Sequence, residues 1–461
     1  MTTPEPTSPP TAPPTISIAI IGSGIIGTIL ALGLLNLPST PTSPKLSIKI
    51  YEQSTSPREI GAGIGFTATA RKCMELMDPR IAACITAVAT LNGEPSSPDY
   101  SMRFVDGFRT FPTAAGSEYD TSDQDISVHG KVYKLYAGPR GFEGCHRAHF
   151  LGEMMKLLPE GVVEFGKRVD GFGYLGGGGV RVSFEGGEEG VECDLVIACD
   201  GIKSRVRELL FSPAYNAKYA HQLAFRGLVP MDRAIEKLGR HRALKQHMHC
   251  GPHAHVLHFP VAKQQLMNVV AFVPDPKEWD LRQGMTAPAS RSEVVDAFRE
   301  WGPFVRGVID LLPEEMDKWA VFDTYDCPVP AYAEGRVALA GDAAHASSPH
   351  HGAGAGMGVE DALALVAAMG KVREDVGRGV GVGRALDVAL QAYSKVRYER
   401  SQWLVRSSRH VCRTYEWEAP DIGADMDQAF ADIRERSHKI WYFDVEAMVA
   451  DVQKECRRLM Q

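Results

Sequence analysis

A glycine-rich turn between a buried strand and an apolar helix is the feature of this 461-residue chain that most restricts its fold. The β-branched run Ile16–Ile21 predicts a fully buried strand, and the apolar segment Thr28–Leu37 predicts a helix. They are joined by three glycines with G-x-G-x-x-G spacing, Gly22, Gly24 and Gly27. Small residues let the backbone approach a pyrophosphate, whose charge meets the positive end of the helix. This order predicts a dinucleotide-binding turn in an α/β fold.

A second strand with an acid at its end supports the same interpretation. The segment Leu46–Tyr51 predicts a strand, and Glu52 follows it, 25 residues after Gly27. In dinucleotide-binding folds an acid at this place accepts hydrogen bonds from ribose hydroxyls. A merely tight turn is the alternative interpretation of the glycines, and the order of strand, turn, helix, strand and acid favours dinucleotide binding.

Composition excludes several classes of protein. With 44% hydrophobic and 23% charged residues, the chain is typical of a globular protein rather than a disordered, collagen-like or coiled-coil one. A net charge of -7 without a basic run argues against a nucleic-acid partner. The 9 cysteines include no C-x-x-C pair, so we expect no disulfide scaffold. These features favour a cytoplasmic protein.

The N-terminal region contains two segments that resemble targeting signals. Residues 1–14 are rich in proline and lack a basic region, which is typical of a disordered lead rather than of a secretory signal. The stretch Ile16–Leu35 is apolar enough to resemble a membrane span, but three glycines interrupt it. We expect no membrane span.

The later pattern indicates that the nucleotide-binding fold is interrupted. The interval Pro95–Gln124 is rich in Pro, Ser and Gly, which indicates that the chain leaves the nucleotide-binding fold there. Strand-like alternation over Ala224–Val273 indicates a second, mainly β region with turns near Gly251 and Lys263. The remaining pattern predicts strands over residues 162–165, 180–184, 193–199 and 336–340, helices over 291–318 and 352–369, a flexible loop over 377–383 and a helical tail.

Three motifs taken together resemble those of the FAD-dependent aromatic hydroxylases, the class A flavoprotein monooxygenases. They are the glycine turn, the segment CDGIKSR that contains Asp200, and the segment AGDAAH that contains Asp342. The resemblance extends over roughly residues 15–445. It is nearest to fungal salicylate-hydroxylase-like and phenol-dearomatising enzymes, through the segments AFRGL at 224–228, HFP at 258–260 and SHKIW at 437–441.

This resemblance implies an α/β fold like that of para-hydroxybenzoate hydroxylase. A discontinuous, Rossmann-like FAD-binding domain would comprise residues 15–100, 138–210 and 326–376. A β-sheet substrate domain, residues 101–137 and 211–325, would be inserted into it, and residues 385–461 would form a C-terminal helical region. Whether the chain is a monomer or a homodimer stays open.

The resemblance also implies the FAD-binding residues. The first motif would hold the ADP half, Asp200 would lie near the pyrophosphate and nicotinamide, and Asp342 would bind the ribityl chain. The backbone of residues 352–356, at the start of a helix, would face the anionic edge of reduced flavin. The implied set is Gly22, Gly24, Gly27, Glu52, Arg58, Gly65, Arg147, Asp200, Asp342, Gly352, Gly354, Ala355 and Gly356, with no metal.

Arg226 is the residue most directly suggested for chemistry. A cation in the apolar strand segment AFRGLV is costly unless it meets an anion, which could be a substrate phenolate or carboxylate or a buried structural partner. Pro349 would flank the flavin. Relatives that dearomatise phenols use a tyrosine hydroxyl at one of two positions, here Phe142 and Phe259, neither of which carries a hydroxyl.

Several polar residues are also consistent with purely structural roles. Asp342 is a candidate helix cap, and Asp200 and Arg205 could form an ion pair in a surface turn. Glu360 and Asp361 are expected to be first-turn helix acids. His345 is expected to be packed and hydrogen-bonded.

A histidine-rich segment resembles a metal site only superficially. The segment from His247 to His255, with His258, alternates histidine with other residues and is equally consistent with a polar sheet face or a pocket wall. A Ser-His-Asp hydrolase is disfavoured because the chain lacks a G-x-S-x-G elbow.

The function predicted on this basis is NAD(P)H- and O2-dependent hydroxylation of a phenolic substrate, polyketide-derived or salicylate-like, through a flavin C4a-hydroperoxide. Oxidative dearomatisation is one outcome of that chemistry. The alternatives are an FAD-dependent dehydrogenase or reductase on the same fold, and an inactive flavin-binding regulator. No second nucleotide-binding motif is visible, so the nicotinamide is expected to bind transiently.

Overall fold

A computed structural model describes residues 13–56, 63–110, 130–187, 189–280, 282 and 284–461. Its first sheet has six strands in the order β20-β21-β13-β1-β2-β9. All neighbouring strands are parallel except β20 and β21. The strands are β1 (Thr15–Ile21), β2 (Lys45–Glu52), β9 (Val163–Phe165), β13 (Leu195–Ala198), β20 (Ala333–Glu334) and β21 (Val337–Leu339). Distant parts of the chain thus form one sheet.

Parallel pairing brings the three motifs together. The strands β1, β13 and β21 are adjacent, and each is followed by one motif: Gly22, Asp200 or Asp342. Because the carboxyl ends of parallel strands meet at one edge, the motifs meet there too. A Cβ atom at Gly22, which has φ +99°, would lie 2.7 Å from the Cys199 carbonyl oxygen, so this turn needs glycine.

The second sheet has eight strands in the order β18-β19-β14-β17-β16-β15-β6-β7 and is antiparallel except between β15 and β6. Its strands are β6 (Ser101–Asp106), β7 (Tyr133–Tyr136), β14 (Lys218–Pro230), β15 (His247–Gly251), β16 (Ala254–Val261), β17 (Leu266–Pro274), β18 (Thr286–Ser290) and β19 (Glu315–Asp323). Both segments assigned to the substrate domain contribute strands, while the predicted domain boundaries stay a prediction.

Three smaller sheets complete the β-structure of the described residues. They are formed by β10 (Val169–Tyr174), β11 (Val180–Phe184) and β12 (Val191–Cys193), by β3 (Gly63–Phe66) and β8 (Glu143–His146), and by β4 (Gly93–Glu94) and β5 (Ser97–Pro98).

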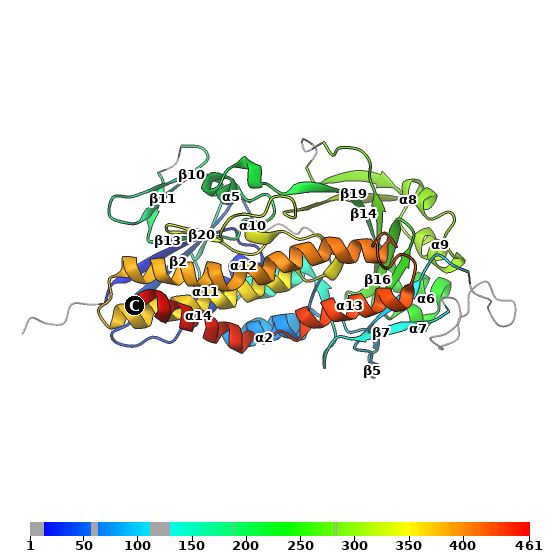
Figure 1. Cartoon of the computed structure of the whole chain (residues 1–461), viewed down its shortest axis with the longest axis horizontal. Helices are drawn as coiled ribbons and strands as arrows, with labels where there is room; N and C mark the ends of the chain where they lie inside the picture. The colour runs from blue at the N-terminus through cyan, green and yellow to red at the C-terminus, as the bar shows by residue number, and fades with distance from the viewer. Residues whose placement is uncertain (1–12, 57–62, 111–129, 188, 281, 283) are drawn as a thin grey trace, which may run out of the picture.

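The C-terminal helices connect the two large sheets. In Figure 1 the orange helix α12 (Val382–Tyr415) runs along the long axis of the molecule, beside α11 (Gly354–Gly377) and α14 (Val445–Met460), and α13 (Met426–Trp441) extends toward the second sheet. The other helices are α1 (Ile25–Leu35), α2 (Ala68–Met77), α3 (Pro79–Val88), α4 (Arg147–Met155), α5 (Arg205–Leu210), α6 (Met231–Leu238), α7 (Arg240–Ala243), α8 (Arg291–Ala297), α9 (Pro303–Asp310) and α10 (Asp342–His345).

Several predicted elements differ from those observed. The predicted helix at 291–318 is wrong in its last part, because β19 begins at Glu315 and pairs with β14. The strand-like region 224–273 contains α6 and α7. The predicted loop at 377–383 is only a short connection, since α11 ends at Gly377 and α12 begins at Val382.

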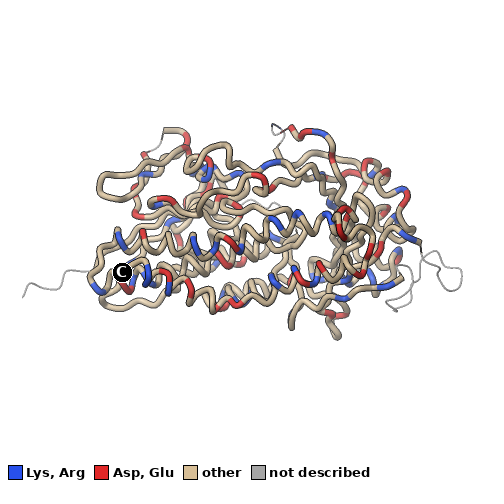
Figure 2. Tube along the Cα trace, in the orientation of Figure 1, with Lys and Arg blue, Asp and Glu red and all other residues tan. Residues whose placement is uncertain are grey.

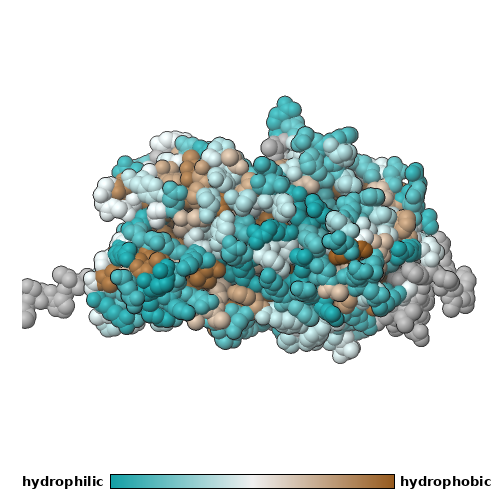
Figure 3. Space-filling view, in the orientation of Figure 1, coloured by the Kyte–Doolittle hydropathy of each residue, from teal (hydrophilic) through white to brown (hydrophobic). Residues whose placement is uncertain are grey.

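The surface carries mixed charge. Figure 2 shows lysine and arginine interspersed with acidic residues along the helices, and Figure 3 shows a mostly hydrophilic face with separate apolar areas. All 9 cysteines are free, and eight of them are buried. None of the described helices combines the length and apolar composition that crossing a bilayer requires.

Candidate functional site

A first cavity, of about 400 Å³, opens at the carboxyl edge of the first sheet. Five of the predicted cofactor-binding residues line it: Gly22, Gly24, Glu52, Arg147 and Asp200. They come from the ends of β1, β2 and β13 and from the start of α4. The structure thus brings together residues that lie up to 178 positions apart in the sequence.

The start of α1 is suited to an anion. Gly24 is its N-cap, no side chain caps the helix, and the first turn contains no acidic residue, so the first N–H groups are left for a ligand. A Cβ atom at Gly24 would meet only Arg147, whose Nη2 would be 3.7 Å away. Arg147 has no hydrogen-bond or ion-pair partner among the described residues. A cation and free N–H groups therefore face the same space, as a pyrophosphate requires.

Glu52 is held at the rim of this cavity by its neighbours. Its Oε2 accepts hydrogen bonds from the N–H and Oγ of Ser23, at 2.9 and 3.0 Å, and its Oε1 accepts one from the Ser54 N–H at 2.8 Å. Burial raises the pKa of Glu52, but these hydrogen bonds outweigh it and leave the pKa below its ordinary value. The carboxylate is ionised and fixed, as an acceptor for ribose hydroxyls needs to be.

We expect the change Glu52→Ala to weaken FAD binding without abolishing it. One hydrogen bond to a charged group contributes about 1.5 to 3 kcal/mol, and a partly exposed site belongs at the lower end, so the Kd should rise roughly ten-fold. Fluorescence titration of apoprotein with FAD measures this. Glu164→Ala, which removes an exposed partner of Lys49 on the adjacent strand, is the control. An unchanged Kd for Glu52→Ala would remove this residue from the site.

Asp200 does not form the surface ion pair that was the alternative to a role in binding FAD. Its Oδ2 accepts a hydrogen bond from the Val206 N–H, and its buried Oδ1 has no partner in the described part of the chain. Arg205 pairs with Glu208 instead, so the alternative interpretation of an ion pair between Asp200 and Arg205 is wrong. Burial raises the pKa of Asp200. A ligand in the cavity would provide the partner that this buried carboxyl oxygen lacks.

A second cavity, of about 350 Å³, lies between the two large sheets and the C-terminal helices. Predicted residues from both sheets and from the segment before α11 line it: Gly65, Phe142, Arg226, Phe259, Asp342, Pro349, Gly352, Gly354 and Ala355. All four predicted catalytic residues thus share one cavity with five of the predicted FAD-binding residues.

Asp342 and the start of α11 form the end of this cavity nearest the first sheet. The helix has no side-chain cap and no acid in its first turn, so its N–H groups face the cavity. Burial by the surrounding protein raises the pKa of Asp342, and its carboxylate makes no hydrogen bond in the described part of the chain. Asp342 begins the short helix α10 rather than capping it, so the helix-cap role is wrong.

These features fit a bound FAD. The first cavity offers free helix N–H groups and an arginine for the pyrophosphate, and the second offers an unpartnered carboxylate beside a second helix start. Arg207 links the two motifs, since its guanidinium donates to the carbonyl oxygens of Ile202, Asp342 and Ala343. Sequence reasoning missed this fully buried arginine, which follows the CDGIKSR motif.

Two aromatic side chains that line the second cavity, Phe142 and Phe259, pack closely against glycines of β3. A Cβ atom at Gly65 would lie 1.9 Å from Phe142, and one at Gly63 would lie 3.3 Å from Phe259. Gly352, with φ +60°, also contacts Phe142. Close packing of β3 against these rings therefore accounts for the glycines at positions 63 and 65.

Arg226 projects from β14 into the second cavity. Its guanidinium lies 5.1 Å from the Trp319 ring centroid, its Nε is buried without a partner, and no described residue forms an ion pair with it. Burial lowers the pKa of Arg226. The structural partner that sequence reasoning left open is absent from the described residues, which favours a ligand anion.

Two of the remaining predicted residues, Gly27 and Gly356, line neither cavity. Arg58 lies outside the described residues. Gly27 lies within α1, where a Cβ atom would be 2.1 Å from the Gly22 carbonyl oxygen, so it packs the helix on the turn. Gly356 packs against Ala70 of α2 beside the second cavity.

A buried polar network supports the segment that contains Asp342. Asp361 accepts hydrogen bonds from the Gly341 N–H at 2.9 Å, from His345 Nε2 at 2.5 Å and from Arg397 Nε at 2.8 Å. Burial raises the pKa of Asp361, but His345 and Arg397 outweigh it and hold the pKa below its ordinary value. His345 is packed as expected. The first-turn role of Glu360 and Asp361 is wrong, because α11 begins six residues before Glu360.

The histidine-rich segment divides between two faces of the second sheet. His247, His249 and His258 stack on one face, where burial lowers the pKa of His258 to about 4. His255 lies on the other face and lines the second cavity. Strand alternation therefore prevents these histidines from converging on one ion. Sequence reasoning also missed that His350, Tyr415, Ser437 and Trp441 line this cavity, although it singled out the segment 437–441 for its resemblance.

The sequence of this chain is similar to those of known flavin-dependent enzymes. Residues 162–408 match the family described as FAD binding domain. The chain is 46% identical over 457 residues to an FAD-dependent monooxygenase of Monascus ruber, covering 97% of this chain and 98% of that protein. It is 43% identical over 453 residues to a salicylate hydroxylase of Sarocladium schorii, covering 95% and 90% of the two.

A solved structure described as a salicylate hydroxylase substrate complex matches with a TM-score of 0.77 at 28% identity, covering 96% of this chain and 98% of that one. The agreement extends over both large sheets and the C-terminal helices. The chain therefore belongs to the class A FAD-dependent monooxygenases, with the fold predicted from its three motifs.

Proposed function

We propose that this monooxygenase hydroxylates a phenolic substrate held in the second cavity. The observation that carries this proposal is Arg226, a half-buried cation without a described anionic partner, in a cavity lined by aromatic and apolar side chains together with several polar ones. A phenolate supplies both the missing anion and an apolar ring. The similarity to a salicylate hydroxylase supports an aromatic substrate.

Each part of FAD can be allotted to residues that line one of the two cavities. Gly22, Gly24 and Arg147 would hold the pyrophosphate, Glu52 the adenosine ribose, and Asp342 the ribityl chain. When bound and reduced by NAD(P)H, FAD activates O2 for transfer to the substrate ring. No second nucleotide-binding domain is formed by the described residues, which supports transient binding of the nicotinamide.

The chain's own residues activate and orient the substrate. A phenol with pKa near 10 needs about 4 kcal/mol to ionise at pH 7, and one cation at about 4 Å contributes roughly that much. Arg226 would hold the phenolate, whose ortho and para carbons are then electron-rich. Phe142, Phe259 and Pro349 would confine the ring and exclude water.

The outcome depends on the carbon that is attacked. Oxygen transfer to a carbon that bears hydrogen gives a catechol or hydroquinone, because loss of that hydrogen restores aromaticity. Transfer to a carbon that bears an alkyl group gives a dearomatised product. Since Phe142 and Phe259 offer no hydroxyl, we propose that substrate substitution decides between these outcomes.

The test is substrate-stimulated NAD(P)H oxidation by the holoenzyme, with a panel of salicylates and resorcinols under 18O2. We expect at least one phenol to accelerate oxidation at least ten-fold and to gain one labelled oxygen atom. Product without label would indicate a dehydrogenase or reductase. Bound FAD without stimulation by any phenol would indicate the inactive regulator.

A further inference from the structure

His255 lines the second cavity and has one ring nitrogen without a hydrogen-bond partner in the described part of the chain. The imidazole lies on β16, is fully buried and stacks on Phe272 with ring centroids 4.5 Å apart. Its Nδ1 lies 3.0 Å from Glu416 Oε1, while its Nε2 has no partner among the described residues. Buried side-chain nitrogens are nearly always hydrogen-bonded, so the free Nε2 needs a partner that enters the cavity.

Glu416, at the end of α12, determines which nitrogen carries the proton. Gln222 Nε2 donates to both carboxylate oxygens, at 2.8 and 2.9 Å, and the Cys412 thiol lies 3.4 Å from Oε2. The carboxylate oxygens thus act as hydrogen-bond acceptors, and Oε1 accepts a hydrogen bond from the Nδ1–H group of His255. The imidazole is thereby fixed with a lone pair on Nε2, as an acceptor.

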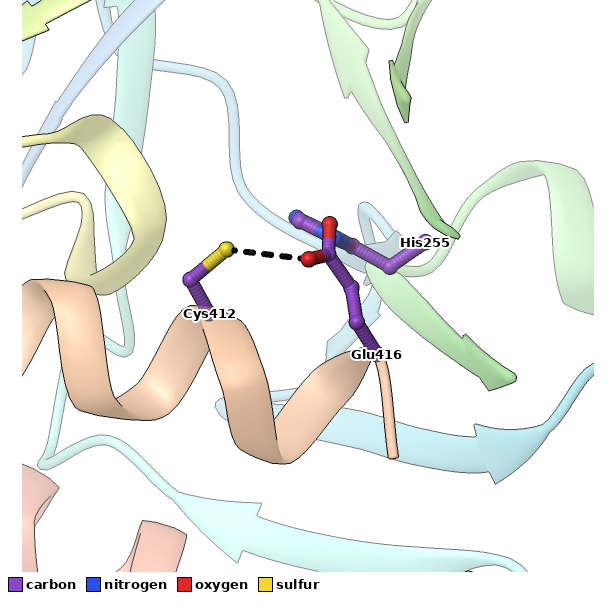
Figure 4. Close-up of side chains that lie close together, drawn as sticks. All are labelled: His255, Cys412 and Glu416. Carbon is purple, nitrogen blue, oxygen red and sulfur yellow. Dashed lines mark hydrogen bonds and ion pairs between the residues drawn. The ribbon is translucent and has the colours of Figure 1, made fainter. Parts of the chain in front are cut away.

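The same residues form the one group among the described residues that has the ligand types and spacing of a metal site. Ligand atoms of His255, Cys412 and Glu416 lie within 4.8 Å of one another. Figure 4 shows these three side chains close together at the end of α12. Gln222 Nε2 donates to Cys412 Sγ at 2.9 Å as well as to the carboxylate, so an amide N–H group occupies the space between them. An N–H donor cannot be a metal ligand. The cluster is therefore a hydrogen-bonded one.

His255 and Arg226 lie on the same face of the second sheet, on strands that are separated by β17. Arg226 pairs with Val270 and Val270 with Leu257, while His255 pairs with Phe272, two residues further along β17. Two strand spacings and two residues place their Cα atoms roughly 12 Å apart. The cavity thus offers a cation at one position and a hydrogen-bond acceptor at another, with an apolar wall between them.

We propose that this cavity recognises an arene with two oxygen substituents, one held as an oxyanion by Arg226 and the other donating its hydroxyl proton to a hydrogen bond with His255 Nε2. Glu416 acts as the positioning residue for His255. The inference rests on the proposed function, because it assumes that the aromatic substrate occupies the second cavity. It narrows the substrate class from phenols to dihydroxylated arenes.

The test compares two probes that differ by one hydroxyl, orcinol (3,5-dihydroxytoluene) and 3-methylphenol. Their Kd values for the holoenzyme are measured from the perturbation of the flavin spectrum. We expect wild type to prefer orcinol at least ten-fold, because a site built for a hydroxyl leaves a polar group unpaired with the analogue. His255→Asn and Glu416→Gln should each reduce the preference to about three-fold or less.

A second His–Glu pair nearby provides the control. His253 Nδ1 lies 2.7 Å from Glu418 Oε1 at the exposed turn between β15 and β16, outside the cavity. His253→Asn also suits the left-handed backbone there, with φ +60°, which asparagine tolerates. His253→Asn and Glu418→Gln should retain the wild-type preference.

Three results would overturn the inference. One is equal affinity of wild type for the two probes, and another is a wild-type preference retained in flavin-loaded His255→Asn. The third is one equivalent of zinc in the purified holoenzyme, measured by mass spectrometry. A failure of the proposed function is recognised separately, since orcinol would then bind with the expected preference and yield no labelled product.

Discussion

The variant Gly24→Val is expected to fold normally and to lose FAD. Gly24 has φ −65° and ψ −177°, which valine adopts without strain, and its Cβ would meet only the end of the Arg147 side chain. The branched side chain would instead fill the space where the pyrophosphate approaches the α1 N–H groups. Overpacking costs about 1–3 kcal/mol, and the lost contacts add to it, so the Kd for FAD should rise at least 100-fold.

Asp342→Ala is expected to have a comparable effect for another reason. Its carboxylate has no hydrogen-bond partner in the described part of the chain, so its loss removes no such bond within the protein. It does remove the acceptor for the ribityl hydroxyls, and leaving polar ligand groups unpaired in a buried site costs about 3 kcal/mol. Both variants should elute colourless from gel filtration at the wild-type volume.

The control for both is Gly152→Val, an exposed position in α4 with open space around its Cβ. It should remain yellow, with a melting temperature near that of wild type. Stoichiometric flavin in Gly24→Val and in Asp342→Ala would contradict the assignment of the two cavities to FAD.

The sequence predicted the part of the site that follows parallel strands. Gly22, Asp200 and Asp342 each stand directly beyond a short apolar run, and sheet geometry then requires them to meet. Arg226 could be proposed as a ligand-binding residue because a cation in an otherwise apolar strand needs an anion, and the structure places it in the second cavity. These inferences use local pattern together with one rule of topology.

The residues proposed to recognise a second hydroxyl could not be found in this way. His255 and Glu416 are 161 residues apart, and only the path of α12 across the second sheet brings them together. Glu416 lies near the end of a long polar helix, where an acid normally faces solvent. Its burial is visible only once Gln222 and Cys412 surround it.

Errors in secondary structure have similar causes. Residues 315–318 read EMDK, a charged run with good helix propensity. They nevertheless form β19, because antiparallel pairing with β14 and β18 satisfies their backbone and lets side chains alternate between solvent and sheet. Tertiary pairing outweighs a propensity that is worth only a few tenths of a kcal/mol per residue.

Arg226→Gln is expected to lower kcat/KM by about 2 to 4 kcal/mol, or roughly 30- to 1000-fold, while FAD content stays at the wild-type level. The loss reflects one buried charge-assisted contact to the phenolate. The melting temperature should stay the same or rise, because the described structure gives Arg226 no anionic partner and burial lowers its pKa. A structural ion pair predicts the opposite, since the stranded anion would cost about 3 to 5 kcal/mol of stability.

The pH profile separates a phenolate anchor from a general loss of fit. In wild type Arg226 ionises the phenol at pH 7, whereas the variant depends on ionisation in solvent, which reaches one half only at the phenol pKa of about 10. The deficit of Arg226→Gln should therefore shrink as pH rises from 7 toward 10. Arg226→Lys retains the positive charge but lacks the planar guanidinium group, so its loss of kcat/KM at pH 7 should be smaller than that of Arg226→Gln. A yellow, stable Arg226→Gln enzyme with a pH-independent deficit would leave Arg226 a role in packing the substrate but not in ionising it.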